Sequence, residues 1–181
     1  MQDNVAEMWN YLGSRGCTRN ALAGICGNAE AESTINPGIW ENLTPTTTPD
    51  INVGYGILQW TPWNKYADWA GTGWENNGIK QCQRILYEAD NNIQWFENYL
   101  APDIGLPVFP AITLKQFLQS TLAPEDLASM FLVYYEHPGN LTTNPTRRSN
   151  ATYWMTFINT LPDPQNMHIP LWMMCKPHWK R

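Results

Sequence analysis

The sequence predicts a mainly α-helical (α+β) fold, in which a helical domain carries a small β-hairpin or irregular lobe near residues 40–60. Two observations predict it. Apolar residues recur at helical spacing over most of the first 160 positions. Residues 38–54, by contrast, are rich in Pro, Thr and Asn and show no period, which is typical of a long loop. We expect residues 1–161 to form one domain, followed by a Pro-, Trp- and Met-rich tail over residues 162–181.

Two helices are expected in the N-terminal part of the chain. The first covers residues 3–12, where apolar side chains lie three and four positions apart. The second begins after an N-cap at Thr18 and ends near Ser33. Gly24 and Gly27 weaken this second helix by ~1 kcal/mol each relative to Ala. Because glycines inside a helix usually allow another element to pack closely, the second helix is expected at the centre of the fold.

The rest of the domain is expected to be helical apart from one short apolar element. The Gly-punctuated run VGYGILQW suits a brief strand or a tight turn near a binding surface. Thr61 and Pro62 have the order of an N-cap followed by a proline at the first helical position, so a helix is expected to start there. The further predictions are helices over 61–69, 79–99, 113–120, 125–136 and 147–160, and a proline-rich loop over 101–111.

Composition and charge argue against several classes of protein. Charged residues make up 15% of the 181 residues and aromatic residues 13%, and the formal net charge is −5. A nucleic-acid-binding protein normally presents a basic face, so nucleic acid is not an expected partner. The many Trp and Tyr side chains can fill a core, but they also stack on sugar rings. The composition therefore mildly favours a carbohydrate-binding cleft.

Neither a targeting segment nor a membrane span is expected. Residues 1–16 lack the charged start and the apolar block of a signal peptide, and no window is long and apolar enough to cross a bilayer. The cysteines form no C-x-x-C pair, which argues against a zinc cluster. Their even number permits disulfides, but free buried thiols are favoured. The four cysteines are Cys17, Cys26, Cys82 and Cys175.

Carboxylate chemistry remains once the other catalytic groups have been considered. The three histidines form no metal-binding motif, a Cys–His pair through His137 has no local support, and no nucleophile elbow or phosphate loop occurs. No metal or other cofactor is therefore expected. Glutamates beside aromatic and amide side chains are typical of enzymes that cleave glycosidic bonds. A carboxyl at a helix end among apolar groups keeps its proton more readily. Glu32 lies at the apolar margin of the second helix, whereas Glu30 lies further towards solvent.

Three segments resemble the lysozyme superfamily, in which a helix-ending Glu-Ser is followed by a Gly-x-x-Gln strand that lines the cleft. The segments are GNAEAESTINPGIWENL, GYGILQWTPWNKYADWA and MFLVYYEHPGN. In order and spacing they are most similar to the phage tail lysozyme family, in particular to the lysozyme domain of the tail-knob peptidoglycan hydrolases of phi29-like phages. The resemblance covers roughly residues 5–160. It implies a lysozyme-like α+β fold with a cleft between the helical domain and the small lobe.

The resemblance also implies roles for individual residues. Glu32 would be the general acid that protonates the glycosidic oxygen. Tyr135 is equally compatible with core packing, and Glu136 with an ion pair to Arg147 or Arg148. Residues implied to bind substrate, from the strand and from the far helix, are Tyr55, Gln59, Trp60, Tyr135 and Glu136.

One position departs from the pattern of chicken-type lysozymes, which carry a second carboxylate immediately before Tyr-Gly. This chain has Gly54 there. The nearest acids in the preceding loop are Asp50, the preferred second catalytic residue, and then Glu41. A carboxylate from that loop is expected farther from Glu32 than the ~5 Å that suits a retaining enzyme. Inversion through an activated water, with carboxyls ~6.5–9.5 Å apart, is the expected alternative.

The function implied is that of a muramidase, which cleaves the glycan strands of bacterial peptidoglycan. The resemblance further implies a phage tail-associated lysin, carried in the virion, that opens the host wall while DNA enters the cell. The C-terminal tail could join it to other phage tail proteins. Three alternatives stay open: a catalytically degenerate glycan-binding or structural tail module, a lytic transglycosylase in which the sugar's own hydroxyl attacks, and an endolysin that acts at lysis.

Overall fold

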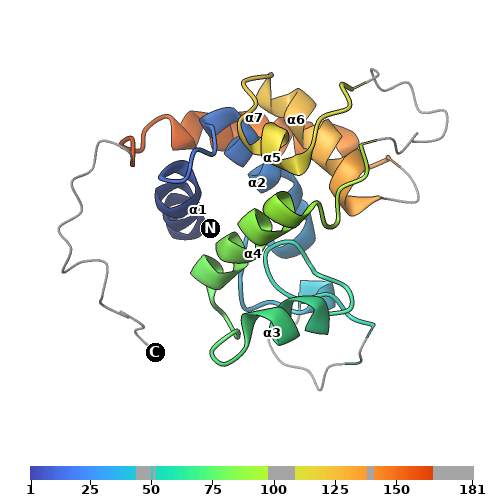
Figure 1. The fold of residues 1–181 in the computed structure, drawn as a ribbon. Helices are drawn as coiled ribbons and strands as arrows, with labels where there is room; N and C mark the ends of the chain where they lie inside the picture. The colour runs from blue at the N-terminus through green and yellow to red at the C-terminus, as the bar shows by residue number, and fades with distance from the viewer. Residues whose placement is uncertain (44–49, 51, 98–108, 138–140, 165–181) are drawn as a thin grey trace.

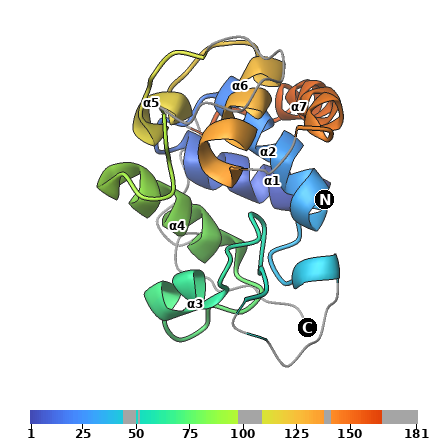
Figure 2. The ribbon, with the colours of Figure 1, turned by 90° about the vertical axis from the view of Figure 1, so that its right-hand side faces the viewer.

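The computed structural model describes residues 1–43, 50, 52–97, 109–137 and 141–164. Helices dominate this part of the chain, which confirms the mainly α-helical prediction. They form a larger and a smaller lobe (Figure 1), and the view in Figure 2, turned by 90°, shows the same separation with α4 between the two. The larger lobe holds α1 (Gln2–Met8), α2 (Arg19–Ser33), α5 (Leu114–Leu118), α6 (Pro124–Phe131) and α7 (Asn144–Ile158); the smaller holds α3 (Asn64–Ala70), and α4 is Gly78–Asn91.

Helix α2 lies at the centre of the larger lobe, as its glycines predict. Thr18 caps its start by accepting a hydrogen bond from a backbone N–H of the first turn. A Cβ atom added at Gly24 would lie 2.9 Å from the Cβ of Leu127 in α6. A Cβ atom added at Gly27 would meet the carbonyl oxygen of Arg147 in α7. Both neighbouring helices therefore approach α2 to a distance that a glycine allows and a larger residue does not.

The described part of the smaller lobe is irregular rather than a hairpin of regular strands. It contains a short 3-10 turn at Glu41–Leu43 and two isolated antiparallel bridges, from Tyr55 to Trp40 and to Trp60. Packed rings stabilise this lobe in place of a hydrogen-bonded ladder. Trp40 and Tyr55, for example, have ring centroids 4.6 Å apart. The rings of this cluster belong to Trp40, Tyr55, Trp60, Trp63, Tyr66 and Trp74.

Two buried polar side chains join the smaller lobe to α2 and α4. The Ser33 hydroxyl, at the end of α2, donates a hydrogen bond of 2.8 Å to the Ile57 carbonyl. Gln81 in α4 accepts from the Ile57 backbone N–H at 2.8 Å and donates to the Pro37 carbonyl at 2.7 Å. Buried hydrogen bonds of this kind are costly to break, so they fix the smaller lobe against the end of α2.

The helix predicted over 79–99 is shorter than expected. It ends at Asn91, because Asn92 adopts a left-handed conformation (φ 51°) that stops the helix. The apolar spacing that suggested a longer helix continues past this point, but Ile93 and Trp95 follow the turn instead. The end of the predicted helix and most of the predicted loop, residues 98–108, lie outside the described residues.

Other helix boundaries differ by a few residues. The helix expected to start at Thr61 begins at Asn64, because the Thr61 hydroxyl donates to the Gln59 carbonyl instead of capping a helix. The last helix begins at Asn144, with a proline in its first turn, rather than at 147. Helix α6 continues through a π-helical turn, η3 (Leu132–Glu136), so the helix predicted over 125–136 is confirmed in its extent.

The described cysteines carry free thiols, and none of the described helices is both long and apolar enough to span a bilayer. Cys17, Cys26 and Cys82 are buried in the core. Burial raises the pKa of the Cys17 thiol to about 12, which keeps it protonated at neutral pH. Cys175 and the tail beyond Pro164 lie outside the described residues.

Candidate active site

A cavity of about 600 Å³ lies where residues of the smaller lobe face the larger lobe and carries most of the polar side chains predicted for the site. Residues of both lobes line it, and so do Glu32 and Arg147, which form an ion pair. The segment before α3 forms one wall, and the ends of α2 and η3 with the first turn of α7 form the other. The lining residues that matter for chemistry are Glu32, Glu41, Gln59, Trp60, Tyr135, Glu136 and Arg147.

Glu32 points into this cavity from the last turn of α2. Its carboxylate forms an ion pair with Arg147 of α7, with 2.5 Å between Oε1 and Nη2. The Glu32 side chain is 27% exposed and that of Arg147 8%. Arg147 is fixed in turn by hydrogen bonds to the Asn28 side chain (3.0 Å) and the Thr143 hydroxyl (3.2 Å). A half-buried carboxyl directed into a cleft is placed to exchange a proton with a bound group.

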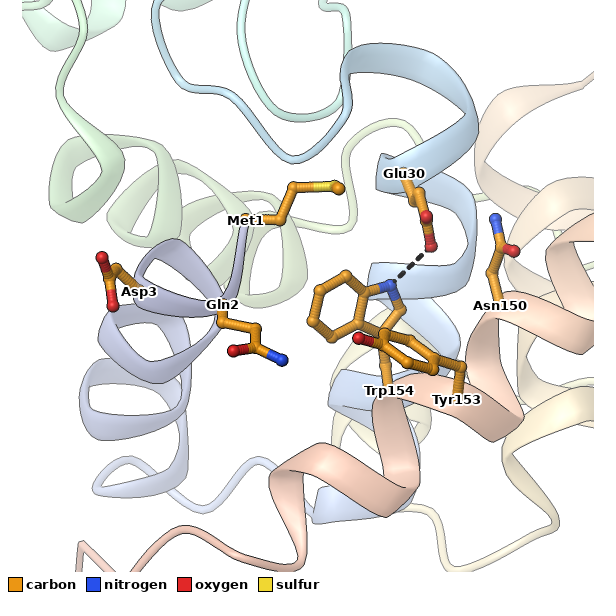
Figure 3. Close-up of a pocket in the computed structure, with 7 residues that line it drawn as sticks. All are labelled: Met1, Gln2, Asp3, Glu30, Asn150, Tyr153 and Trp154. Carbon is orange, nitrogen blue, oxygen red and sulfur yellow. Dashed lines mark hydrogen bonds between the residues drawn. The ribbon is translucent and has the colours of Figure 1, made fainter.

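Glu30 lies in a different cavity, of about 570 Å³, between the start of α1 and α7. Figure 3 shows its carboxylate pointing at the indole of Trp154, which donates a hydrogen bond of 2.8 Å to it. Tyr153 and Asn150 flank the same opening. Glu30 is therefore directed away from the cavity that holds Glu32, and it has a structural partner of its own.

Glu136 ends the π-helical turn η3 and lines the same cavity as Glu32. One of its carboxyl oxygens, Oε1, is buried and has no hydrogen-bond partner within the described part of the chain. Burial, followed by the negative charge of Glu32, raises the pKa of Glu136 to about 8, although Arg147 acts in the opposite direction. The alternative of an ion pair to Arg148 is not realised, because Arg148 binds Asp126 at 2.9 Å.

Tyr135 and Trp60 meet at a buried glutamate that sequence reasoning did not single out. Glu88 of α4 accepts hydrogen bonds from the Tyr135 hydroxyl (2.6 Å) and the Trp60 indole N–H (3.0 Å), and it pairs with Arg84 (2.7 Å). Burial raises the pKa of Glu88, and these three donors oppose that effect. Because α4, η3 and the smaller lobe each contribute one partner, Glu88 fixes the rear of the cavity.

Gln59 and Gly54 shape the wall of the smaller lobe. Gln59 adopts a left-handed conformation (φ 48°), and its amide donates to the Gly56 carbonyl at 2.9 Å. Its Oε1 is buried without a hydrogen-bond partner among the described residues. A Cβ atom added at Gly54 would lie 2.9 Å from both the carbonyl oxygen and Oε1 of Gln59. The fold therefore leaves no space at position 54 for the carboxylate that chicken-type lysozymes carry there.

The remaining candidates occupy different places. Tyr55 is buried in the ring cluster of the smaller lobe, where its hydroxyl accepts from the Asn76 backbone N–H at 2.7 Å, and it does not line the cavity. Asp50 is exposed and accepts a hydrogen bond from the backbone N–H of Asn52 at 3.0 Å; Asn52 lines the cavity, but Asp50 does not. Glu41 does line it, and its carboxylate accepts from the Gly54 N–H at 3.0 Å. Of these two acids, Glu41 is therefore the one that lines the cavity.

No described cluster of three or more His, Cys, Asp or Glu side chains is arranged to hold a metal ion. The chemistry of the cavity, within the part of the chain that the structure describes, is that of carboxyls, amides, a hydroxyl, one guanidinium, one ammonium and aromatic rings. Such a set can transfer protons and hydrogen-bond hydroxyl groups.

Comparison with known proteins identifies the family of this chain. The family model for phage tail lysozymes matches residues 3–158, which include Glu32, Glu136 and Arg147. Morphogenesis protein 1 of Bacillus phage B103 is 41% identical over 160 residues, which cover 85% of this chain. The matched part is 39% of that relative, so the chain spans about two fifths of its length. The resemblance inferred from the sequence is confirmed: the chain belongs to the phage tail lysozyme family.

Proposed function

We propose that this protein is a muramidase, a glycoside hydrolase that cleaves the glycan strands of peptidoglycan, with Glu32 as its general acid. The observation that carries the proposal is the position of Glu32, which ends a central helix and directs its carboxylate into a polar cavity that both lobes line. A glycosidic oxygen leaves readily only when an acid protonates it. The family membership supports this assignment over that of a surface charge.

Substrate recognition is assigned to the residues around Glu32. Gln59 lines the cavity, and its side-chain amide is assigned to hydrogen-bond a sugar hydroxyl or amide. Trp60 and Tyr135 are buried and held by Glu88, so they form the floor of the cavity rather than a mobile wall. A rigid, pre-organised floor reduces the entropy lost when a glycan strand binds.

The second carboxylate is assigned to Glu41, which replaces Asp50 in this role. Glu41 belongs to the lobe opposite Glu32, and the Gly54 N–H orients its carboxylate. From the opposite wall it would activate a water molecule on the far face of the sugar, which leads to inversion at the anomeric carbon. Tyr55 then contributes to the site as core of the smaller lobe, not as a contact to substrate.

We assign the activity to the phage virion tail, where the protein would open the host wall locally while DNA enters the cell. The support is the phage tail lysozyme family and the likeness to a phage morphogenesis protein. The tail over residues 162–181 would provide contacts to other phage tail proteins. Antibodies against the protein should label intact virions; labelling confined to lysates would favour a lysis endolysin instead.

The central test is the substitution Glu32→Gln, which keeps the size of the side chain and removes the acid. Release of reducing ends from purified peptidoglycan should fall by at least ~10³-fold, because general acid catalysis and the paired charge are both lost. Glu30→Gln is the matched control, since it alters a glutamate two residues away that faces another cavity, and it should keep wild-type activity. Full activity in Glu32→Gln would refute the assignment.

Product analysis separates the remaining alternatives. Mass spectrometry of the digest should show hydrated reducing ends at the muramic acid residues. Anhydro ends would identify a lytic transglycosylase. Binding of chitooligosaccharides without any turnover would identify a glycan-binding module.

A further inference from the structure

Glu136 has no role in the reaction as proposed so far, although it shares the cavity with Glu32. We propose that Glu136 is a positioning residue that stores the proton later delivered by Glu32, and that Glu32, Arg147 and Glu136 work as one proton-exchange unit. This inference rests on the proposed function, because it deepens the role assigned to Glu32.

The unpartnered oxygen of Glu136 is the first observation. Its Oε1 is buried and finds no donor among the described residues, while Glu32 has Arg147 and Glu88 has three donors. A buried carboxylate without a donor is strongly disfavoured, whereas a protonated carboxyl is neutral and can itself donate. The geometry therefore fits a proton-carrying Glu136 in the substrate-free protein.

The charge balance of the cavity is the second observation. The single guanidinium of Arg147, held by Asn28 and Thr143, pairs with Glu32. One ionised carboxylate neutralises that charge; a second would leave an uncompensated negative charge in a half-buried place. At neutral pH the unit therefore binds one proton. The pKa of Glu136, raised to about 8 by burial and by the charge of Glu32, agrees with this location of the proton.

Substrate binding can move the proton from Glu136 to Glu32 without a change in the net charge of the unit. The proton leaves the Glu136 carboxyl for the Glu32 carboxylate, and the Arg147 guanidinium exchanges Glu32 for Glu136 as its ionic partner. When the glycosidic C–O bond breaks, the leaving oxygen takes the proton from Glu32. The water oxygen bonds to the anomeric carbon, and its proton passes to Glu41. Glu41 then returns a proton to solvent, and the exchange unit takes one up.

Other charges act on the unit from the neighbouring elements. Glu88 of α4 also raises the pKa of Glu136, but its own charge is compensated by Arg84. Glu41 and Lys65 of the smaller lobe line the same cavity with opposite charges. Because Glu136→Gln leaves all of these groups in place, this substitution isolates the contribution of the stored proton.

The test is the pH dependence of kcat/KM on purified peptidoglycan between pH 4 and 9. Glu136→Gln should lower the rate at pH 7 at least ~10-fold and shift the alkaline limb down by roughly one pH unit or more, because the proton reservoir is lost. At pH 5, where solvent supplies protons more readily, the rate should stay within ~3-fold of wild type. Glu136→Asp should restore part of the alkaline limb, and the exposed control Glu75→Gln should leave the whole profile unchanged. An unchanged profile in Glu136→Gln, or an equal loss at every pH, would overturn the inference.

A second measurement does not depend on whether Glu136→Gln folds. In ¹³C NMR of the wild-type protein with labelled glutamate carboxyls, one carboxyl should titrate near pH 8. In Glu32→Gln the pH midpoint of this titration should fall, because the negative charge of Glu32 that raises it is absent. If no glutamate titrates above pH 7, the exchange unit is refuted even where Glu32→Gln is inactive. Full activity in Glu32→Gln would instead refute the proposed function, whatever the titration shows.

Discussion

Single residues of the same type acquire different properties in this cleft because their partners differ. Glu32 faces a guanidinium, Glu88 accepts three hydrogen bonds, and Glu136 has a buried oxygen without a donor among the described residues. Charge partners and donors stabilise the ionised form of a carboxyl, and burial without them stabilises the neutral form. Two carboxyls whose environments favour opposite protonation states are the arrangement that acid–base chemistry needs.

The absence of a carboxylate at position 54 leads to a prediction at the same scale. Gly54→Asp should lower the free energy of unfolding by ~1–3 kcal/mol and give no gain in activity, because its Cβ would collide with the carbonyl oxygen of Gln59. Gly54→Ala carries the same Cβ and should be destabilised to a similar extent. Urea unfolding of both variants checks this. If Gly54→Ala is as stable as wild type while Gly54→Asp is not, the cause is charge rather than space.

At the scale of elements, the contact of α2 with α7 connects packing to chemistry. Gly27 lets the backbone of α7 approach at Arg147, and this approach brings the guanidinium within reach of Glu32 on the next turn of α2. Ser33, one residue further on, ties the same helix end to the smaller lobe. The last two turns of α2 therefore set both the ion pair and the position of the opposite wall.

Gly27→Ala tests this connection. Alanine favours an exposed helix by ~1 kcal/mol over glycine, but here the added Cβ would displace α7, so the protein should lose ~1–3 kcal/mol of stability. Activity should fall as well, because Arg147 moves with α7. The reverse change at an exposed position of α2, Ala31→Gly, should cost ~1 kcal/mol by propensity alone and leave activity intact. Thermal unfolding and peptidoglycan assays distinguish the two; a stabilised Gly27→Ala would contradict the close-packing argument.

For the molecule as a whole, the sequence was sufficient for features that depend on local pattern. Helical spacing predicted most of the helices, and the glycines of α2 predicted its central position. The end of α4 at Asn92 was not predicted, because a residue in the left-handed conformation can end a helix while the apolar pattern of the sequence continues.

The partners within the site were less accessible to sequence reasoning. Glu88 meets Tyr135 across 47 positions, and Arg147 meets Glu32 across 115. No local signal predicts such pairs, because they depend on how helices cross. Tyr55 matched a motif but belongs to the core of the smaller lobe, and proximity in sequence favoured Asp50 where the fold brings Glu41 to the cavity.

The pH dependence of folding gives a final prediction for the whole molecule. Because the pKa of Glu136 is raised from 4.5 to about 8, the folded state binds this proton more tightly than the unfolded state does. Stability from this group is complete below pH 4.5 and is lost progressively as the pH rises from there to about 8. Glu7 and Glu88, whose pKa values burial also raises, act in the same direction.

Urea unfolding at pH 5, 6, 7 and 8 measures this dependence. The free energy of unfolding should fall with pH in the wild type and fall less steeply in Glu136→Gln, so that the two curves converge or cross towards pH 8. Glu75→Gln, an exposed glutamate outside the cleft, should give a curve parallel to that of the wild type. Parallel curves for wild type and Glu136→Gln would mean that Glu136 is ionised in the folded protein throughout this range. Its buried oxygen would then need a donor that moves in when the carboxyl loses its proton, and Arg147, whose charge already acts on Glu136, carries suitable N–H groups.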